Sequence, residues 1–157
     1  MSLLNNLQQL CIEKGVSIAV AESCTAGLIA SKLTTLPGSS SYFNGGVVAY
    51  QNEIKTKILG VSQSIIDEKT EVSAEVVNQM AKSVLEKFDA NFAIATTGYA
   101  GPAGGTNKNP IGTVFIAITS VAGVVVSRFV FSGNRQSVVN QASESALGLL
   151  CAEVKKQ

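Results

Sequence analysis

The sequence has no histidine and no tryptophan, and only three cysteines among its 157 residues. Without histidine, a Ser-His-Asp triad, a Cys-His pair and histidine-based zinc sites are all excluded. The three cysteines, Cys11, Cys24 and Cys151, are odd in number and none stands at metal-ligand spacing from another. This pattern predicts a reduced protein with no structural disulfide and no bound metal.

Charge is also scarce, because charged residues make up 15% of the chain and nearly cancel to a net charge of +1. No basic run could follow a phosphate backbone, so we expect no nucleic-acid partner. The longest apolar stretch, near 121–126, is far short of the ~20 residues that span a bilayer. The first fifteen residues also lack the basic and apolar regions of a signal peptide, so we expect a cytoplasmic protein with no membrane partner.

Hydrophobic residues, in contrast, make up 46% of a chain about the size of one domain. Periodicity and turn residues predict helices over 3–14, 26–33, 52–59, 73–88 and 135–154, and strands over 16–21, 43–50, 91–97, 111–119 and 124–131. We expect Asn52 and Ser73 to cap two of these helices, and the last two strands to form a hairpin. This order predicts a single α/β domain over 1–157, with three α/β/α layers around a mixed sheet.

The segment Glu22-Ser23-Cys24-Thr25 joins a predicted strand to a predicted helix. A hydroxyl at such a turn stands clear of the sheet, and free N–H groups of the new helix can stabilise an oxyanion. Ser23 is therefore a candidate nucleophile, although Ser23 or Thr25 could instead simply cap the helix. Cys24 is a rival nucleophile. Without a histidine partner, we interpret Cys24 as a packed small residue.

A serine nucleophile needs a base, and lysine is the next candidate once histidine is absent. An exposed lysine has a pKa of roughly 10.4, which burial or a nearby cation must lower before the amine can accept a proton. Lys55 follows a strand and a glycine pair, and Lys57 lies two residues on, on another helix face. From local sequence alone, the favoured interpretation of both is a solvated helix lysine.

The loop 98–105 contains four glycines and one proline in eight residues. Glycine permits backbone conformations and close approach that a side chain would block. Such a loop at a strand end suits a nucleotide or its phosphate, although a plain long turn fits the same residues.

Together these segments resemble the nicotinamide-nucleotide amidases, the family of the CinA C-terminal domain. The resemblance covers about residues 5–155. It is carried by five blocks in order: AESCTAG, PGSSSYFNGGVVAYQNEIKTKILGV, EVSAEVVNQMA, TTGYAGPAGGTNKNPIGTVFIAI and FSGNRQSVVNQASESAL.

The resemblance implies an enzyme that hydrolyses nicotinamide mononucleotide to nicotinic acid mononucleotide and ammonia, as part of pyridine nucleotide recycling, with no cofactor. It implies that Ser23 is the nucleophile, that Lys55 is its base and that the Tyr50 hydroxyl completes the site. Arg135 would meet the nucleotide phosphate or an adjacent subunit, and we expect a homo-oligomer. The other implied substrate-binding residues are Glu22, Cys24, Thr25, Ala26, Gly27, Gly98, Ala100, Gly101, Gly104 and Gly105.

Three positions depart from the family pattern. Ala26 and Ala103 replace glycines, and Asn140 stands where an arginine is common. Each bears on substrate affinity more than on the chemistry. Two alternatives therefore stay open: a catalytically impaired nucleotide-binding or interaction module of the same fold, and a hydrolase of another small amide. Larger members carry an additional pyrophosphatase domain, an activity that we do not expect here.

Overall fold

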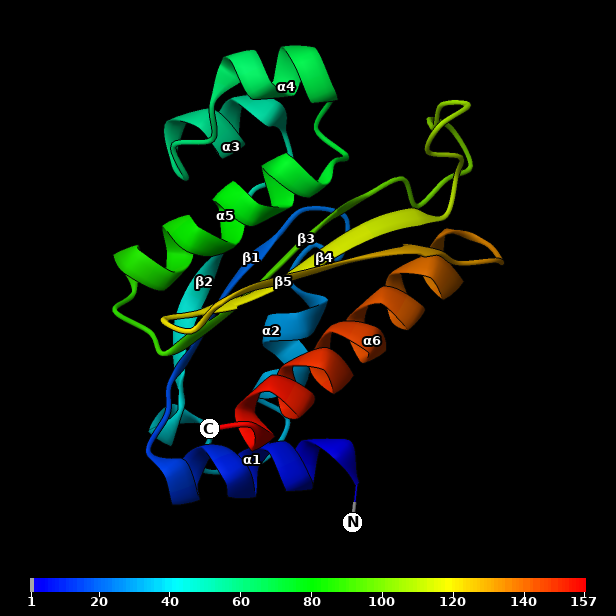
Figure 1. Cartoon of the computed structure of the whole chain (residues 1–157). Coiled ribbons are helices and arrows are strands. Elements are labelled where there is room, and N and C mark those ends of the chain that lie inside the picture. Colours follow the sequence, from blue (N-terminus) through cyan, green and yellow to red (C-terminus); the bar gives the residue numbers. More distant parts are fainter. Residues whose placement is uncertain (1) are drawn as a thin grey trace.

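The computed structural model describes residues 2–157, and its centre is one mixed five-stranded sheet (Figure 1). Its strands lie in the order β2-β1-β3-β4-β5. The first three of these run parallel, whereas β4 pairs antiparallel with both β3 and β5. The strands are β1 (Ile18–Glu22), β2 (Phe43–Val48), β3 (Phe92–Gly98), β4 (Thr113–Ser120) and β5 (Gly123–Val130).

Helices cover both faces of this sheet (Figure 1). On one face lie α1 (Leu3–Lys14), α2 (Leu28–Leu33) and α6 (Arg135–Lys155). On the other lie α3 (Asn52–Lys57), α4 (Gln63–Lys69) and α5 (Ala74–Lys87), and a 3₁₀ turn at Ser39–Ser41 precedes β2. The expected three-layer α/β/α architecture with a mixed sheet is confirmed. Within residues 2–157, no helix has the length and apolar character needed to cross a bilayer.

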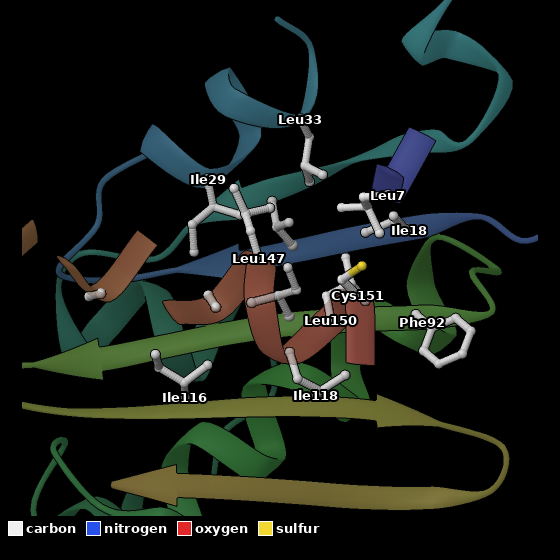
Figure 2. Packing of buried hydrophobic residues seen from close by; sticks show 14 of the residues in the cluster. Leu7, Ile18, Ile29, Leu33, Phe92, Ile116, Ile118, Leu147, Leu150 and Cys151 are labelled. Carbon is white, nitrogen blue, oxygen red and sulfur yellow. The ribbon is translucent and has the colours of Figure 1, made fainter. Parts of the chain in front are cut away.

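The two faces of the sheet pack differently because the central strands alternate large and small residues. Phe92 and Ile94 of β3 join the cluster that α1, α2 and α6 cover, where Leu147 and Leu150 of α6 pack (Figure 2). The intervening side chains of β1 and β3 are alanines, which contact the apolar face of α5. Small residues on this face let α5 lie close to the strands that end at the site described below.

The predicted helix ends are confirmed at two positions and wrong at two. Gly15 ends α1 in the left-handed conformation, with φ 63°. Ser73 caps α5 by accepting from the Val76 N–H at 3.3 Å. Asn52 is not a cap, because α3 already begins there and is preceded by Gln51, whose side chain makes no capping bond. The helix predicted from Ala26 begins only at Leu28, and α4 was not predicted at all.

Candidate active site

A cavity of about 390 Å³ opens at the carboxyl ends of the three parallel strands. Its walls come from the residues that follow β1, β2 and β3, together with α3 and the start of α6. Ligands of open α/β sheets bind at this edge, and the volume lies within the ~300–1,000 Å³ of small-molecule sites. The lining residues are Ser23, Cys24, Tyr50, Gln51, Asn52, Lys55, Glu71, Val72, Thr97, Gly98, Tyr99, Ala100, Gly101, Ala103 and Arg135.

Ser23 lies in the wall of this cavity because the chain turns sharply after β1. The Ser23 N–H donates to the Thr96 carbonyl of the neighbouring strand β3, and the Ser23 carbonyl accepts from the Ala26 N–H, both at 3.1 Å. Ala26 and Gly27 then take positive φ angles of 49° and 94°, so the helix begins two residues later than the sequence predicts. The turn leaves the Ser23 side chain largely buried, at 7% exposed, against the cavity.

Glu22, one residue earlier, holds this turn in place rather than lining the cavity. Its carboxylate is fully buried and accepts three hydrogen bonds: from the Thr25 hydroxyl at 2.6 Å, the Ile29 N–H at 2.9 Å and the Ala30 N–H at 3.0 Å. Thr25 in turn bonds the Thr96 hydroxyl at 2.9 Å. The buried acid therefore ties the first turn of α2 to the end of β1, which fixes the backbone of Ser23 between them.

Lys55 is the more unusual residue of the site, because its long cationic side chain is only 1% exposed. Its Nζ donates to the Tyr50 carbonyl at 3.0 Å. Burial lowers the pKa of this amine, and the charge of Glu71 partly opposes that shift. Lys57, in contrast, is 66% exposed and pairs with Glu53 at 2.6 Å. Of the two lysines, Lys55 shares the cavity with Ser23.

Cys24 also lines the cavity, but its surroundings disfavour a thiolate. Burial, more than any other cause, raises the pKa of this thiol to about 12. A reactive cysteine needs a lowered pKa, so the environment suits the interpretation of Cys24 as a packed small residue.

Tyr50 and Arg135 form the rim. The Tyr50 hydroxyl accepts from an Arg135 Nη at 2.5 Å, and the other Nη donates to the Gly101 carbonyl at 2.7 Å. The Tyr50 carbonyl accepts from Lys55 inside the cavity. The residue as a whole is half exposed, and its hydroxyl lies at the mouth. Arg135 is the first residue of α6, where the helix dipole favours anions.

The glycine-rich loop contributes only in part. Gly98, Ala100 and Gly101 line the cavity, whereas Gly104 and Gly105 line a separate hollow. Packing also requires a glycine at position 98, because a Cβ there would lie 2.6 Å from the Thr113 carbonyl oxygen. Thr25 and Ala26 line a third hollow, next to the rim formed by Tyr50 and Arg135.

Five lining residues lie outside the segments that the sequence predicted to form the site. Most are neighbours of predicted ones, so extending each predicted segment by a residue or two would have found them. Glu71 and Val72 are different, because they lie in the connection between α4 and α5 and open the EVSAEVVNQMA block, to which the resemblance assigned no site role. The five are Gln51, Asn52, Glu71, Val72 and Thr97, whereas Tyr99 and Ala103 belong to the predicted loop 98–105.

Comparison with known proteins places this chain in a family. Residues 1–154 match the family model of the CinA C-terminal domain. The chain belongs to that family. A CinA-like protein from Desulfotalea psychrophila is 45% identical over 142 residues, which are 90% of this chain and 34% of the relative. A putative competence-damage inducible protein from Halothermothrix orenii is 42% identical over 135 residues, or 85% of this chain and 33% of the relative.

This CinA domain thus spans about a third of the length of the curated relatives it matches. Solved structures cover it almost completely. A CinA superfamily protein from Klebsiella pneumoniae superposes with a TM-score of 0.94 at 31% identity, covering 99% of this chain and 97% of that one. The competence/damage inducible protein CihA from Agrobacterium tumefaciens gives 0.89 at 34% identity, with 97% and 96% covered.

Proposed function

We propose that this CinA domain is an amidohydrolase that converts nicotinamide mononucleotide to nicotinic acid mononucleotide and ammonia, with Ser23 as nucleophile and Lys55 as base. The observation that carries the proposal is the buried amine of Lys55 in the same cavity as the Ser23 turn. Enclosure lowers the pKa of Lys55, and a lysine must lose its charge before it can act as a base.

In the proposed reaction, Ser23 Oγ attacks the carboxamide carbon while neutral Lys55 takes the Ser23 proton. The Ser23 and Ala26 N–H groups already donate to backbone carbonyls, so we assign the developing oxyanion to the N–H groups of Cys24 and Thr25. One such donor is typically worth about 2.7–4 kcal/mol in the transition state. Lys55 then returns the proton to the amide nitrogen, ammonia leaves, and water hydrolyses the acyl-enzyme.

The rim suits the other end of the nucleotide. The Arg135 guanidinium stands beside the N-terminus of α6, and both attract a phosphate. Arg135 holds Tyr50 and Gly101 together across the mouth of the cavity. The hydroxyl of Tyr50 would thus act through Arg135 at the rim.

Ammonia release from nicotinamide mononucleotide tests the proposal, with wild type, Ser23→Ala and Cys24→Ala measured side by side. We expect wild type to be active and Ser23→Ala to lose at least ~10³-fold in kcat, since removal of a serine nucleophile costs this much or more. Cys24→Ala should retain most of the activity. An unchanged rate in Ser23→Ala would rule out Ser23 as nucleophile. Binding without ammonia release by the wild type would favour a nucleotide-binding module, and a panel of other amides would reveal a different substrate.

A further inference from the structure

Glu71 is a charged residue of the cavity to which the proposed mechanism gives no role. It lies in the connection between α4 and α5, and it lines the same cavity as Ser23 and Lys55. The charged side chains of that lining are Lys55, Glu71 and Arg135. Arg135 comes from the helix layer on one face of the sheet, and Glu71 precedes α5 on the other. The cavity therefore carries one carboxylate and one guanidinium from opposite layers.

The backbone around Glu71 is held firmly. The Thr97 hydroxyl donates to the Glu71 carbonyl at 2.7 Å, and the Ser73 hydroxyl donates to the Thr70 carbonyl at 3.0 Å. Thr70 itself takes φ 69°, which a β-branched residue rarely adopts. Strained backbone of this kind persists where surrounding contacts determine it, and it clusters at functional sites. The connection thus fixes the position of Glu71 in the wall of the cavity.

The carboxylate itself has no cationic partner in the described part of the chain. None of the four ion pairs within residues 2–157 includes Glu71, and its hydrogen bond to Thr97 uses the backbone carbonyl. It is also close enough to Lys55 to raise the pKa of that amine against the effect of burial. A raised pKa keeps Lys55 protonated and so opposes its proposed role as a base. A cation of the substrate that faced the Glu71 carboxylate would remove this disadvantage.

We propose, resting on the function proposed above, that Glu71 binds the positively charged ring of the substrate. The site would then select amides carried on an N-substituted, cationic pyridinium ring over the same amide on a neutral ring. The two charges of the cavity match the two charges of such a nucleotide: Glu71 faces the ring cation, and Arg135 at the rim faces the phosphate. A bound cation also offsets Glu71 at Lys55, which favours the neutral amine when the substrate is in place.

Two probes that carry the same amide, ribose and phosphate on rings of different charge test this selection. Nicotinamide mononucleotide has a cationic ring, and its 1,4-dihydro form has the same amide, ribose and phosphate on a neutral ring. Dissociation constants would be measured by calorimetry in a Ser23→Ala background, so that nothing turns over. We expect Glu71→Gln to weaken binding of the cationic form about tenfold, or about 1.4 kcal/mol, and to change the neutral form less than twofold. Glu75→Gln, an exposed acid that lines a different hollow, is the matched control and should change neither.

The outcomes separate this inference from the function on which it rests. If wild type releases ammonia but Glu71→Gln binds both probes as tightly as before, or weakens both equally, Glu71 does not read the ring charge and the inference alone fails. If wild type neither binds the cationic nucleotide nor releases ammonia from it, the proposed function fails and the inference fails with it.

A pH profile provides a readout that a purely structural role would not move. The titratable groups that share the cavity with Lys55 are Cys24, Tyr50, Glu71, Tyr99 and Arg135. Because the Glu71 charge raises the pKa of Lys55, Glu71→Gln should shift the acidic limb of kcat/KM to lower pH. An acidic limb that stays in place would show that Glu71 does not act on Lys55, and would overturn this part of the proposal.

Discussion

Glu22 and Lys55 are both almost wholly buried, at 0% and 1% exposed, yet they differ in how many hydrogen bonds the protein makes to them. The Glu22 carboxylate accepts three hydrogen bonds, two of them from backbone N–H groups of α2. The Lys55 ammonium has three protons to donate, and among residues 2–157 a single acceptor, the Tyr50 carbonyl, receives one. The Glu22 carboxylate therefore has its hydrogen bonds filled by the protein, whereas the Lys55 amine has donors free to face the cavity.

The contrast separates a positioning role from a chemical one. A buried charge with full hydrogen bonding stabilises the geometry around it, as Glu22 does for the Ser23 turn. A buried charge with few partners instead shifts its pKa toward the neutral form, as Lys55 does. Shifted pKa values beside a cavity are typical of reactive groups. Substitutions at the two residues should therefore give opposite patterns of stability and activity.

The largest expected effect is on activity in Lys55→Met. Loss of a general base typically costs ~10²–10⁴-fold in rate, so we expect ammonia release to fall by that factor. Stability should stay equal or rise, because an apolar side chain of similar length replaces a poorly partnered buried amine. Ammonia assays and urea denaturation on the same samples measure both.

Lys57→Met is the control for this change. Lys57 is mostly exposed and pairs with Glu53 on the surface, so its loss should leave the rate within about twofold. A rate that survives in Lys55→Met but falls in Lys57→Met would transfer the role of base to Lys57.

Glu22→Gln should show the reverse pattern, with a loss of stability. The Glu22 carboxylate accepts hydrogen bonds from Thr25, Ile29 and Ala30. The NH₂ group of a glutamine would face at least one of these donors and could not accept its hydrogen bond. An unsatisfied buried group costs about 1–3 kcal/mol, which urea denaturation would detect. The exposed Glu53→Gln is the control, at about 0.5 kcal/mol or less. Equal urea midpoints for Glu22→Gln and Glu53→Gln would show that the hydrogen bonds of the Glu22 carboxylate do not stabilise the fold.

The sequence was most informative where a residue's role depends on its neighbours in the chain. The β1 strand, the Ser23 turn, and the caps at Gly15 and Ser73 follow from local periodicity and turn chemistry. The turn itself was misjudged by two residues, because Ala26 takes a positive φ that alanine does not favour, in a turn where its N–H donates to the Ser23 carbonyl.

The remaining features depend on contacts between distant segments, which local patterns do not contain. Local sequence alone favoured a solvated Lys55, and its burial arises only when α3 folds against the ends of the strands. Glu71 opens the EVSAEVVNQMA block but had no predicted site role, since it reaches the cavity through a connection held by Thr97 of β3. Glu22 has a structural role because α2 turns back so that its backbone N–H groups meet the carboxylate.

Stability against pH gives a smaller effect that isolates the Lys55 amine. Its pKa is lowered in the folded protein, so between that value and the ordinary value near ~10.4 the unfolded chain binds more protons than the folded one. Folding stability should therefore rise with pH in that window, by at most about 1.4 kcal/mol per pH unit, and fall as pH drops through it. Subtracting the free energies of Lys55→Met from those of wild type removes the other titrating groups. Parallel curves would mean that the folded pKa is not lowered.

The smallest expected effect concerns the Ser23 turn, which the Glu22 carboxylate holds in place. Ala26 holds φ 49°, where glycine has no Cβ penalty, so Ala26→Gly should raise the unfolding free energy by about 0.5–1 kcal/mol. Ala103→Gly is the matched control, because Ala103 is not among the described residues with positive φ. Glycine there only adds freedom to the unfolded chain, so stability should fall by about 0.4–1 kcal/mol. The same substitution would then have opposite signs at two positions, and a loss of stability in both would show that the Ser23 turn is not strained at Ala26.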